Sequence, residues 1–137
     1  MESRIEQTAL RHKKGYNCAQ AVLCTYCDLF GVDEETAFRM AEGLGLGMGN
    51  MEGTCGAMTA ACMLAGMKNS TVNLEKPDSK GGTYRICRTL MGSFAEKAGS
   101  VTCKELKGVE TGKVLLSCPD CVRTAADLVD EVLIETR

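Results

Sequence analysis

Apolar residues recur at spacings of three and four along most of the chain, and no segment alternates apolar and polar positions for more than four residues. This spacing places apolar side chains on one face of a helix and argues against strands. The pattern predicts helices over residues 3–14, 18–30, 34–42, 55–67, 84–98 and 118–135, with one further helical turn over 103–107. The predicted fold class is therefore all-α, a single domain over residues 1–137 built as a bundle of five or six helices.

Capping residues and glycines mark the predicted helix boundaries. Asn17, Asp33 and Thr54 precede helical segments, and their side-chain oxygens are suited to accept hydrogen bonds from the free N–H groups of a first turn. Glycines end four of the predicted segments, at positions 15, 31, 99 and 108.

Three segments between and within the predicted helices stand out. Residues 55–67 carry no charged side chain, which predicts a helix buried on all sides; burial at the centre of a monomer and burial in a homodimer explain this equally. Residues 68–83 are polar and are expected to form a loop of about 15 residues, a length typical of functional or mobile segments. Residues 43–53 contain five glycines, which predicts either a flexible connector or a backbone that passes close to another group or adopts positive φ. Their spacing never completes a dinucleotide-binding G-x-G-x-x-G, and no strand precedes them.

The composition is that of an ordinary soluble globular protein, with 45% apolar and 25% charged residues. A formal net charge of −2 gives no electrostatic reason to expect nucleic acid as a partner. No apolar run approaches the roughly 20 residues of a membrane span, and the first residues lack the apolar segment of a secretion signal. We therefore expect a cytoplasmic protein with no membrane span and no nucleic-acid partner.

Nine cysteines are the main chemical feature of the chain. A reducing cytosol disfavours structural disulfides, and an odd count leaves at least one thiol unpaired. The thiols are therefore metal ligands, redox groups or inert buried side chains. Cys118-Pro119-Asp120-Cys121 begins the last predicted helix, where the partial positive charge of the helix N-terminus favours thiolates. A helical projection places both cysteines of this pair on the apolar face.

Two further cysteines have positions that suggest function. Cys55 begins the apolar helix directly after the glycine-rich segment, and Gly56 beside it allows a close approach. Cys103 opens a short turn before an irregular stretch, where ligands often lie. The chain has a second C-x-x-C pair, Cys24-Thr25-Tyr26-Cys27. No histidine follows either pair, so the haem-attachment sequence is absent. His12 is expected to lie at the surface. Core or incidental surface positions are expected for Cys24, Cys27, Cys62 and Cys87.

Four stretches resemble the motifs of the redox-active bacterial family named for its C…GCAxxG…C…C cysteines. They are Gly15-Tyr16-Asn17-Cys18-Ala19-Gln20-Ala21-Val22, Gly53-Thr54-Cys55-Gly56-Ala57-Met58-Thr59-Ala60, Gly99-Ser100-Val101-Thr102-Cys103-Lys104-Glu105-Leu106, and Cys118 followed by Val122. The motifs occur in order over nearly the whole chain, with Ala60 standing where the family pattern has Gly. The resemblance implies that the functional cysteines are Cys18, Cys55, Cys103 and Cys118, with Cys121 as an alternative to Cys118.

That family is also similar to a domain of split-Soret cytochromes, which carry haem and an iron–sulfur centre. Because the haem-attachment sequence is absent, the resemblance implies an iron–sulfur cluster without haem, held by these four cysteines and used in electron transfer with an unidentified redox partner. Two alternatives stay open. One is a thiol–disulfide oxidoreductase in which Cys118 attacks and Cys121 resolves. The other is a structural zinc site. The sequence also leaves open whether the protein is an enzyme.

Overall fold

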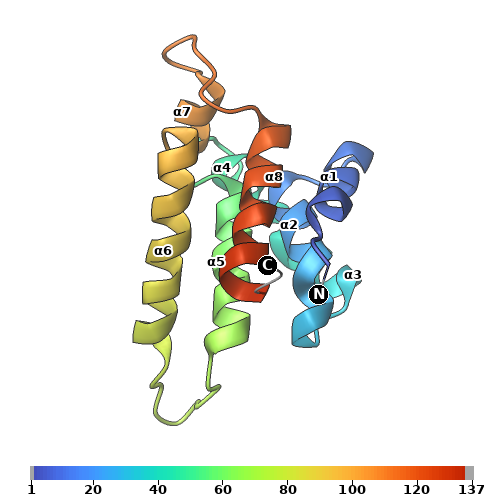
Figure 1. The fold of residues 1–137 in the computed structure, drawn as a ribbon, viewed down its shortest axis with the longest axis vertical. Helices are drawn as coiled ribbons and strands as arrows, with labels where there is room; N and C mark the ends of the chain where they lie inside the picture. Colours follow the sequence, from blue (N-terminus) through green and yellow to red (C-terminus); the bar gives the residue numbers. More distant parts are fainter. Residues whose placement is uncertain (1, 135–137) are drawn as a thin grey trace.

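The computed structural model describes residues 2–134, and Figure 1 shows their arrangement as a bundle of helices. Six α-helices have eight or more residues: α1 (Ile5–Lys14), α2 (Cys18–Tyr26), α3 (Glu34–Ala41), α5 (Gly56–Asn69), α6 (Lys80–Ala98) and α8 (Cys118–Val129). Shorter helical elements are η1 (Cys27–Phe30), η2 (Glu42–Leu44), α4 (Gly45–Met48), α7 (Cys103–Lys107) and η3 (Asp130–Ile134). No β-strand occurs within residues 2–134, so the predicted all-α class is confirmed.

Helix α5 lies at the centre of the bundle. It packs against α2 on one side and α6 on the other, with α8 alongside, as Figure 1 shows. Seven of its fourteen residues are buried, including Met58 and Leu64 at 0% exposure, and the others, apart from the exposed Lys68, are half-buried. The chain therefore buries part of this apolar helix, not all sides of it as predicted. Every residue of α2 is buried as well. Its last residue, Tyr26, joins α2 to the end of α8 by donating its hydroxyl to the Asp130 carboxylate at 2.6 Å.

Most of the predicted boundaries are confirmed. Asn17 caps α2 in a reciprocal capping box, in which its side chain accepts from the Gln20 N–H while the Gln20 side chain accepts from the Asn17 N–H. Asp33 caps α3 by accepting from the Thr36 N–H at 3.0 Å. Glycines with positive φ follow α1, η1, α6 and α7, at positions 15, 31, 99 and 108.

The boundaries around the central helix differ from the prediction. Thr54 does not cap α5, because its backbone forms an isolated antiparallel bridge with Thr102, and Cys55 takes the cap position without a side-chain cap bond. The predicted 68–83 loop is shorter, because α5 continues to Asn69 and α6 begins at Lys80. Asn69 steadies this turn by donating to the Thr83 hydroxyl at 3.0 Å. The predicted end of the last helix, residue 135, lies outside the described residues.

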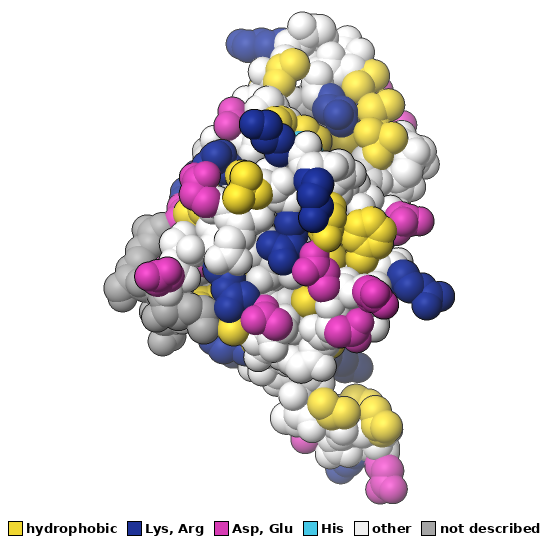
Figure 2. Space-filling view, turned by 90° about the vertical axis from the view of Figure 1, so that its right-hand side faces the viewer, with side chains coloured by type: hydrophobic (Ala, Val, Ile, Leu, Met, Phe, Trp, Pro, Cys, Tyr) yellow, Lys and Arg dark blue, Asp and Glu magenta, His cyan; other side chains and the backbone are white. Residues whose placement is uncertain are grey.

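The surface carries charges of both signs. Figure 2 shows basic and acidic side chains interspersed over the face that it presents. Within residues 2–134, none of the helices is both long enough and apolar enough to cross a membrane.

Candidate functional site

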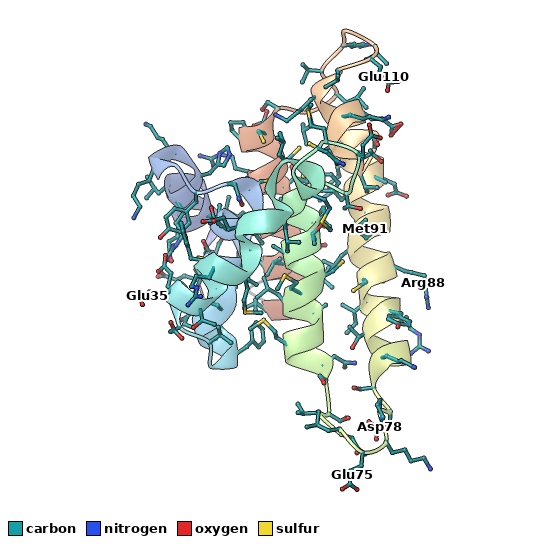
Figure 3. All side chains as sticks on the ribbon, turned by 180° about the vertical axis from the view of Figure 1, so that it is seen from behind. Glu35, Glu75, Asp78, Arg88, Met91 and Glu110 are labelled. Carbon is teal, nitrogen blue, oxygen red and sulfur yellow. The ribbon has the colours of Figure 1, made fainter. Side chains whose placement is uncertain are left out.

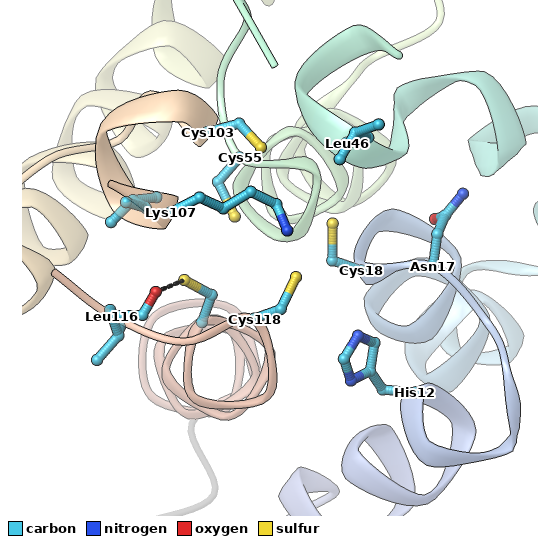
Figure 4. A pocket seen from close by; sticks show the side chains of 11 residues that line it. His12, Asn17, Cys18, Leu46, Cys55, Cys103, Lys107, Leu116 and Cys118 are labelled. Carbon is cyan, nitrogen blue, oxygen red and sulfur yellow. Dashed lines mark hydrogen bonds between the residues drawn. The ribbon is translucent and has the colours of Figure 1, made fainter. Parts of the chain in front are cut away.

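One end of the bundle contains a cavity of about 190 Å³ lined by five cysteines (Figure 4). They come from four different elements, and they are the five that the sequence analysis selected: Cys18, Cys55, Cys103, Cys118 and Cys121. Four of them are buried, and Cys118 is half-buried. The remaining cysteines do not line this cavity. The fold therefore gathers thiols that are up to 103 positions apart in the sequence, from Cys18 to Cys121.

Helix starts position these thiols. Cys18 is the first residue of α2, Cys118 is the first residue of α8, and Cys55 occupies the cap position of α5. At α8, Ser117 accepts from the Asp120 N–H, and Pro119 fits the first turn because it needs no N–H partner there. The partial positive charge of three helix N-termini therefore points toward one cavity, which favours anions there.

Backbone pairing places Cys55 beside Cys103. The Cys103 N–H donates to the Gly53 carbonyl at 3.0 Å, and the Cys55 N–H donates to the Val101 carbonyl at 2.7 Å. These bonds flank the bridge between Thr54 and Thr102. The chain just before α5 and the chain just before α7 therefore run together, and the two cysteines emerge side by side at their ends.

The glycine-rich segment packs directly against the thiols. A Cβ atom at Gly47 would lie 2.5 Å from the Cys103 Cβ and 3.4 Å from the Cys103 sulfur. A Cβ atom at Gly56, in the first turn of α5, would lie 2.8 Å from the carbonyl oxygen of Leu44 in this segment and 2.8 Å from the Cys18 sulfur. Gly47 also has a φ of 54°, and its neighbour Leu46, which lines the cavity, has a φ of 55°. The segment is therefore not a flexible connector. It is a tight series of turns that needs glycine both for close approach and for left-handed backbone.

Hydrogen bonds among the thiols favour negative charge on Cys18. The thiols of Cys118 and Cys55 lower the pKa of Cys18 well below its usual range, and they outweigh the opposing effect of burial. The backbone N–H groups of Leu46 and Ala57 act in the same direction. The pKa of Cys55 is raised, first by its interactions with Cys121 and Cys18 and then by burial. Among these interacting thiols, negative charge is therefore favoured at Cys18 over Cys55.

Three other polar side chains, Asn17, Lys107 and His12, also line the cavity, and the sequence analysis did not place Lys107 or His12 there. Lys107 of α7 extends into the cavity in Figure 4. Its ammonium group opposes the effect of burial, which raises the pKa of Cys103. Lys107 follows Cys103 by four positions, and this helical spacing is the signal that could have identified it. His12, which was predicted to lie at the surface, is half-buried at the end of α1 and also lines the cavity.

The thiols do not converge on a single point. Within residues 2–134, no three or more His, Cys, Asp or Glu side chains form a group that could hold one metal ion. Cys121 instead directs its thiol to the Leu116 carbonyl, at 3.7 Å. The sulfurs are therefore spread around the cavity wall.

The other cysteines lie elsewhere in the bundle. Cys24 and Cys27 are buried, and their thiols donate to backbone carbonyls of Glu34 and Cys24, at 3.7 and 3.5 Å. Burial raises the pKa of Cys24 to about 12. Core positions were one of the two expectations for this pair, and the structure places both thiols in the core. Cys62 and Cys87 are half-buried.

Comparison with known protein families gives one result. Residues 16–132 match the model of the family described as "Putative redox-active protein (C_GCAxxG_C_C)". The match covers most of the chain, so the protein belongs to this family, and the resemblance drawn from the sequence motifs is confirmed. Comparisons with curated proteins and with solved structures give no match.

Proposed function

We propose that this protein transfers electrons through an iron–sulfur cluster held by Cys18, Cys55, Cys103 and Cys118. One observation carries the proposal: these four thiols lie at the starts of four separate elements and all line one cavity. Four thiolates are the usual ligand set of such clusters. Membership of a redox-active family supports the same chemistry.

The size of the cavity and the spread of the sulfurs suit a group larger than one ion. A tetrahedral zinc ion holds its sulfurs at about 2.3 Å, which requires all four thiolates to converge on one point. Within the described residues no such convergence occurs, while the cavity measures about 190 Å³. Thiolates that bind different iron atoms of one cluster are spaced further apart. Four cysteines suit either group, and the spread of the sulfurs and the volume of the cavity favour a cluster over a structural zinc ion.

The interactions of Cys118 and Cys121 differ, and the difference favours Cys118 as the fourth ligand. The Cys121 thiol is buried and donates to the Leu116 carbonyl. The Cys118 thiol is half-buried and interacts with Cys18, which also lines the cavity. On deprotonation Cys121 gives up its bond to a backbone carbonyl, and Cys118 gives up its interaction with Cys18. That interaction and burial raise the pKa of Cys118, whereas Cys55 lowers the pKa of Cys121, so the choice of Cys118 rests on its greater exposure and its contact with Cys18.

The protein's own groups prepare the cavity for negative charge. The N-termini of α2, α5 and α8 and the ammonium group of Lys107 are the positive charges and dipoles around it. When bound, a cluster would supply one-electron redox chemistry at this position. Leu46 lines the cavity and is 45% exposed, so only one side-chain layer separates the cavity from solvent there. That short path suits electron exchange with a partner protein.

Anaerobic reconstitution with iron and sulfide tests this proposal. We expect visible absorbance, together with iron and acid-labile sulfide in stoichiometric amounts. Cys18→Ala should lose most of the bound iron. Cys24→Ala is the matched control, because both thiols lie on α2 and both are buried, and it should keep the iron. A reconstituted protein that stays colourless and iron-free, or equal losses in the two variants, would contradict the proposal.

A thiol–disulfide oxidoreductase is the second candidate function. Cys118 and Cys121 line the same cavity and lie one helical turn apart at the start of α8, as an attacking and a resolving thiol do. This function requires disulfide reductase activity in iron-free protein and its loss in Cys118→Ser. Metal analysis of protein purified without oxygen distinguishes the two functions, because the oxidoreductase needs no iron.

A further inference from the structure

Helices α5 and α6 run antiparallel, and one pair of contacts sets their register. The Asn69 side chain donates to the Thr83 hydroxyl, and a Cβ atom at Gly66 would lie 3.9 Å from the Thr83 methyl group. In antiparallel helices, one turn back along the first helix matches one turn forward along the second. Position 62 on α5 therefore faces position 87 on α6.

Both of these positions are cysteines. The Cys62 and Cys87 side chains interact with each other, as the register requires. Both residues are half-buried, so small reagents can reach them. Arg88, next to Cys87, points away from α5 in Figure 3, which leaves Cys87 on the inner side of α6. Gly66, one turn from Cys62, adds no side chain between the two helices, and a Cβ atom there would be in ordinary contact with Thr83 at 3.9 Å.

We propose that Cys62 and Cys87 form a second redox site, a reversible disulfide that links α5 to α6. It is separate from the cavity: Cys62 follows Cys55 by seven residues, which is about 10 Å along the helix axis. The oxidant is a low-molecular-weight disulfide of the glutathione type. The proposal does not depend on the iron–sulfur cluster.

The reaction is two successive thiol–disulfide exchanges. The Cys87 thiolate attacks one sulfur of the small disulfide and releases a first small thiolate, leaving a mixed disulfide on Cys87. The Cys62 sulfur then displaces the second small thiolate and forms the Cys62–Cys87 bond. Two protein thiols are oxidised, one small disulfide is reduced to two thiols, and the two protons pass to those thiols. Burial and Cys87 raise the pKa of Cys62 to about 12, which suits Cys62 to the second, intramolecular step.

Peptide mapping of the full-length protein tests this proposal. Fully reduced protein is treated with oxidised glutathione without oxygen, alkylated and digested with trypsin. We expect a cross-link between the peptide of residues 40–68 and the peptide of residues 86–88, and its disappearance after dithiothreitol. The thermal unfolding midpoint should rise by an amount on the order of 10 °C on oxidation, because the bond closes a long loop in the unfolded chain.

Variants assign the bond within that cross-link. The peptide of residues 40–68 contains Cys55 as well as Cys62, so Cys62→Ser should remove the cross-link. Cys87→Ser should also remove it, together with the rise in the midpoint, whereas Cys24→Ala should keep both. The proposal fails if Cys62 and Cys87 are found alkylated in wild-type protein that was treated with oxidised glutathione. It also fails if the cross-link persists in Cys62→Ser. The wild-type map decides the question even where a variant does not fold.

Discussion

Replacing Gly56 by alanine tests how tightly the first turn of α5 is packed against the site. A Cβ atom there would lie 2.8 Å from the Cys18 sulfur and 2.8 Å from the Leu44 carbonyl oxygen. Both distances are well inside normal contact. The carbonyl belongs to the backbone and cannot swing aside as a flexible side chain can, so the loop or Cys18 must move.

Two opposing effects set the expected stability change. Alanine is favoured over glycine within a helix by at most about 1 kcal/mol. Forcing a methyl group into a packed core costs about 1–3 kcal/mol. Because the methyl group meets both a backbone oxygen and a sulfur, we expect the overpacking cost to dominate. The net loss should be about 1–2 kcal/mol in the free energy of unfolding, with a displaced Cys18 thiol and weaker iron uptake.

A second glycine serves as the matched control. Gly92 lies on the exposed face of α6, and a Cβ atom there would meet nothing within 4 Å. Gly92→Ala should therefore stabilise the protein by about 0.5–1 kcal/mol. Urea unfolding of reduced, metal-free protein, followed by helical circular dichroism, measures both changes, and iron per chain after reconstitution measures the site. If Gly56→Ala were as stable as Gly92→Ala and bound iron like the wild type, the close-packing argument would be wrong.

Three further predictions concern the cap, the charge and the pH response. Asn17→Ala removes the side chain that caps α2 at Cys18 and should lower the free energy of unfolding by about 1–2 kcal/mol in a urea titration. Lys107→Ala removes a positive charge from the cavity, which disfavours the reduced, more negative cluster. Spectroelectrochemistry should therefore show a reduction potential more negative by tens of millivolts, on the order of 1 kcal/mol. Lys104 lies on the same helix but outside the lining, so Lys104→Ala should show little change. Arg11 holds the pKa of Glu34 at about 2, below its ordinary 4.5, so its stabilising effect is present above pH 4.5 and is lost as the pH falls toward 2. Glu34 is 42% exposed, so this loss should stay below about 1 kcal/mol. The urea midpoint of the wild type should exceed that of Glu34→Gln above pH 4.5, and the two midpoints should converge as the pH falls toward 2.

Local signals predicted most of the helices. Asn17 and Asp33 have side chains that can cap a helix, and each is followed by apolar residues at helical spacing. These two signals agree, and the structure shows both caps. Thr54 also has a side chain that can cap a helix, but it does not cap α5, because its backbone pairs with Thr102, 48 positions away. Gly81 and Gly82 indicated a loop, yet both lie in the first turn of α6. Contacts across the turn, such as Asn69 with Thr83, outweigh the low helix propensity of glycine there.

The candidate site was predictable in its thiols but not in its other walls. Cys55 and Cys118 were selected because each lies at a helix start, a property that the sequence shows locally. His12 lies at the end of α1, and nothing in its charged surroundings indicates that this end faces α2 and α8. Leu46 lines the cavity and has a positive φ, a conformation that sequence patterns do not predict for leucine. These residues depend on tertiary arrangement alone.

The dispersed ligand set makes the proposed cluster a property of the folded chain. Ligands that follow one another within a few residues can gather around a metal before the rest of the chain has folded. Here the four thiols lie at the starts of α2, α5, α7 and α8, and none of the four can reach the others until those elements have packed. Binding free energy at such a site adds to the stability of the fold. The glycines and caps that bring the elements together, Gly47, Gly56 and Asn17 among them, are therefore as much part of the site as the sulfurs, even though none of them supplies a ligand.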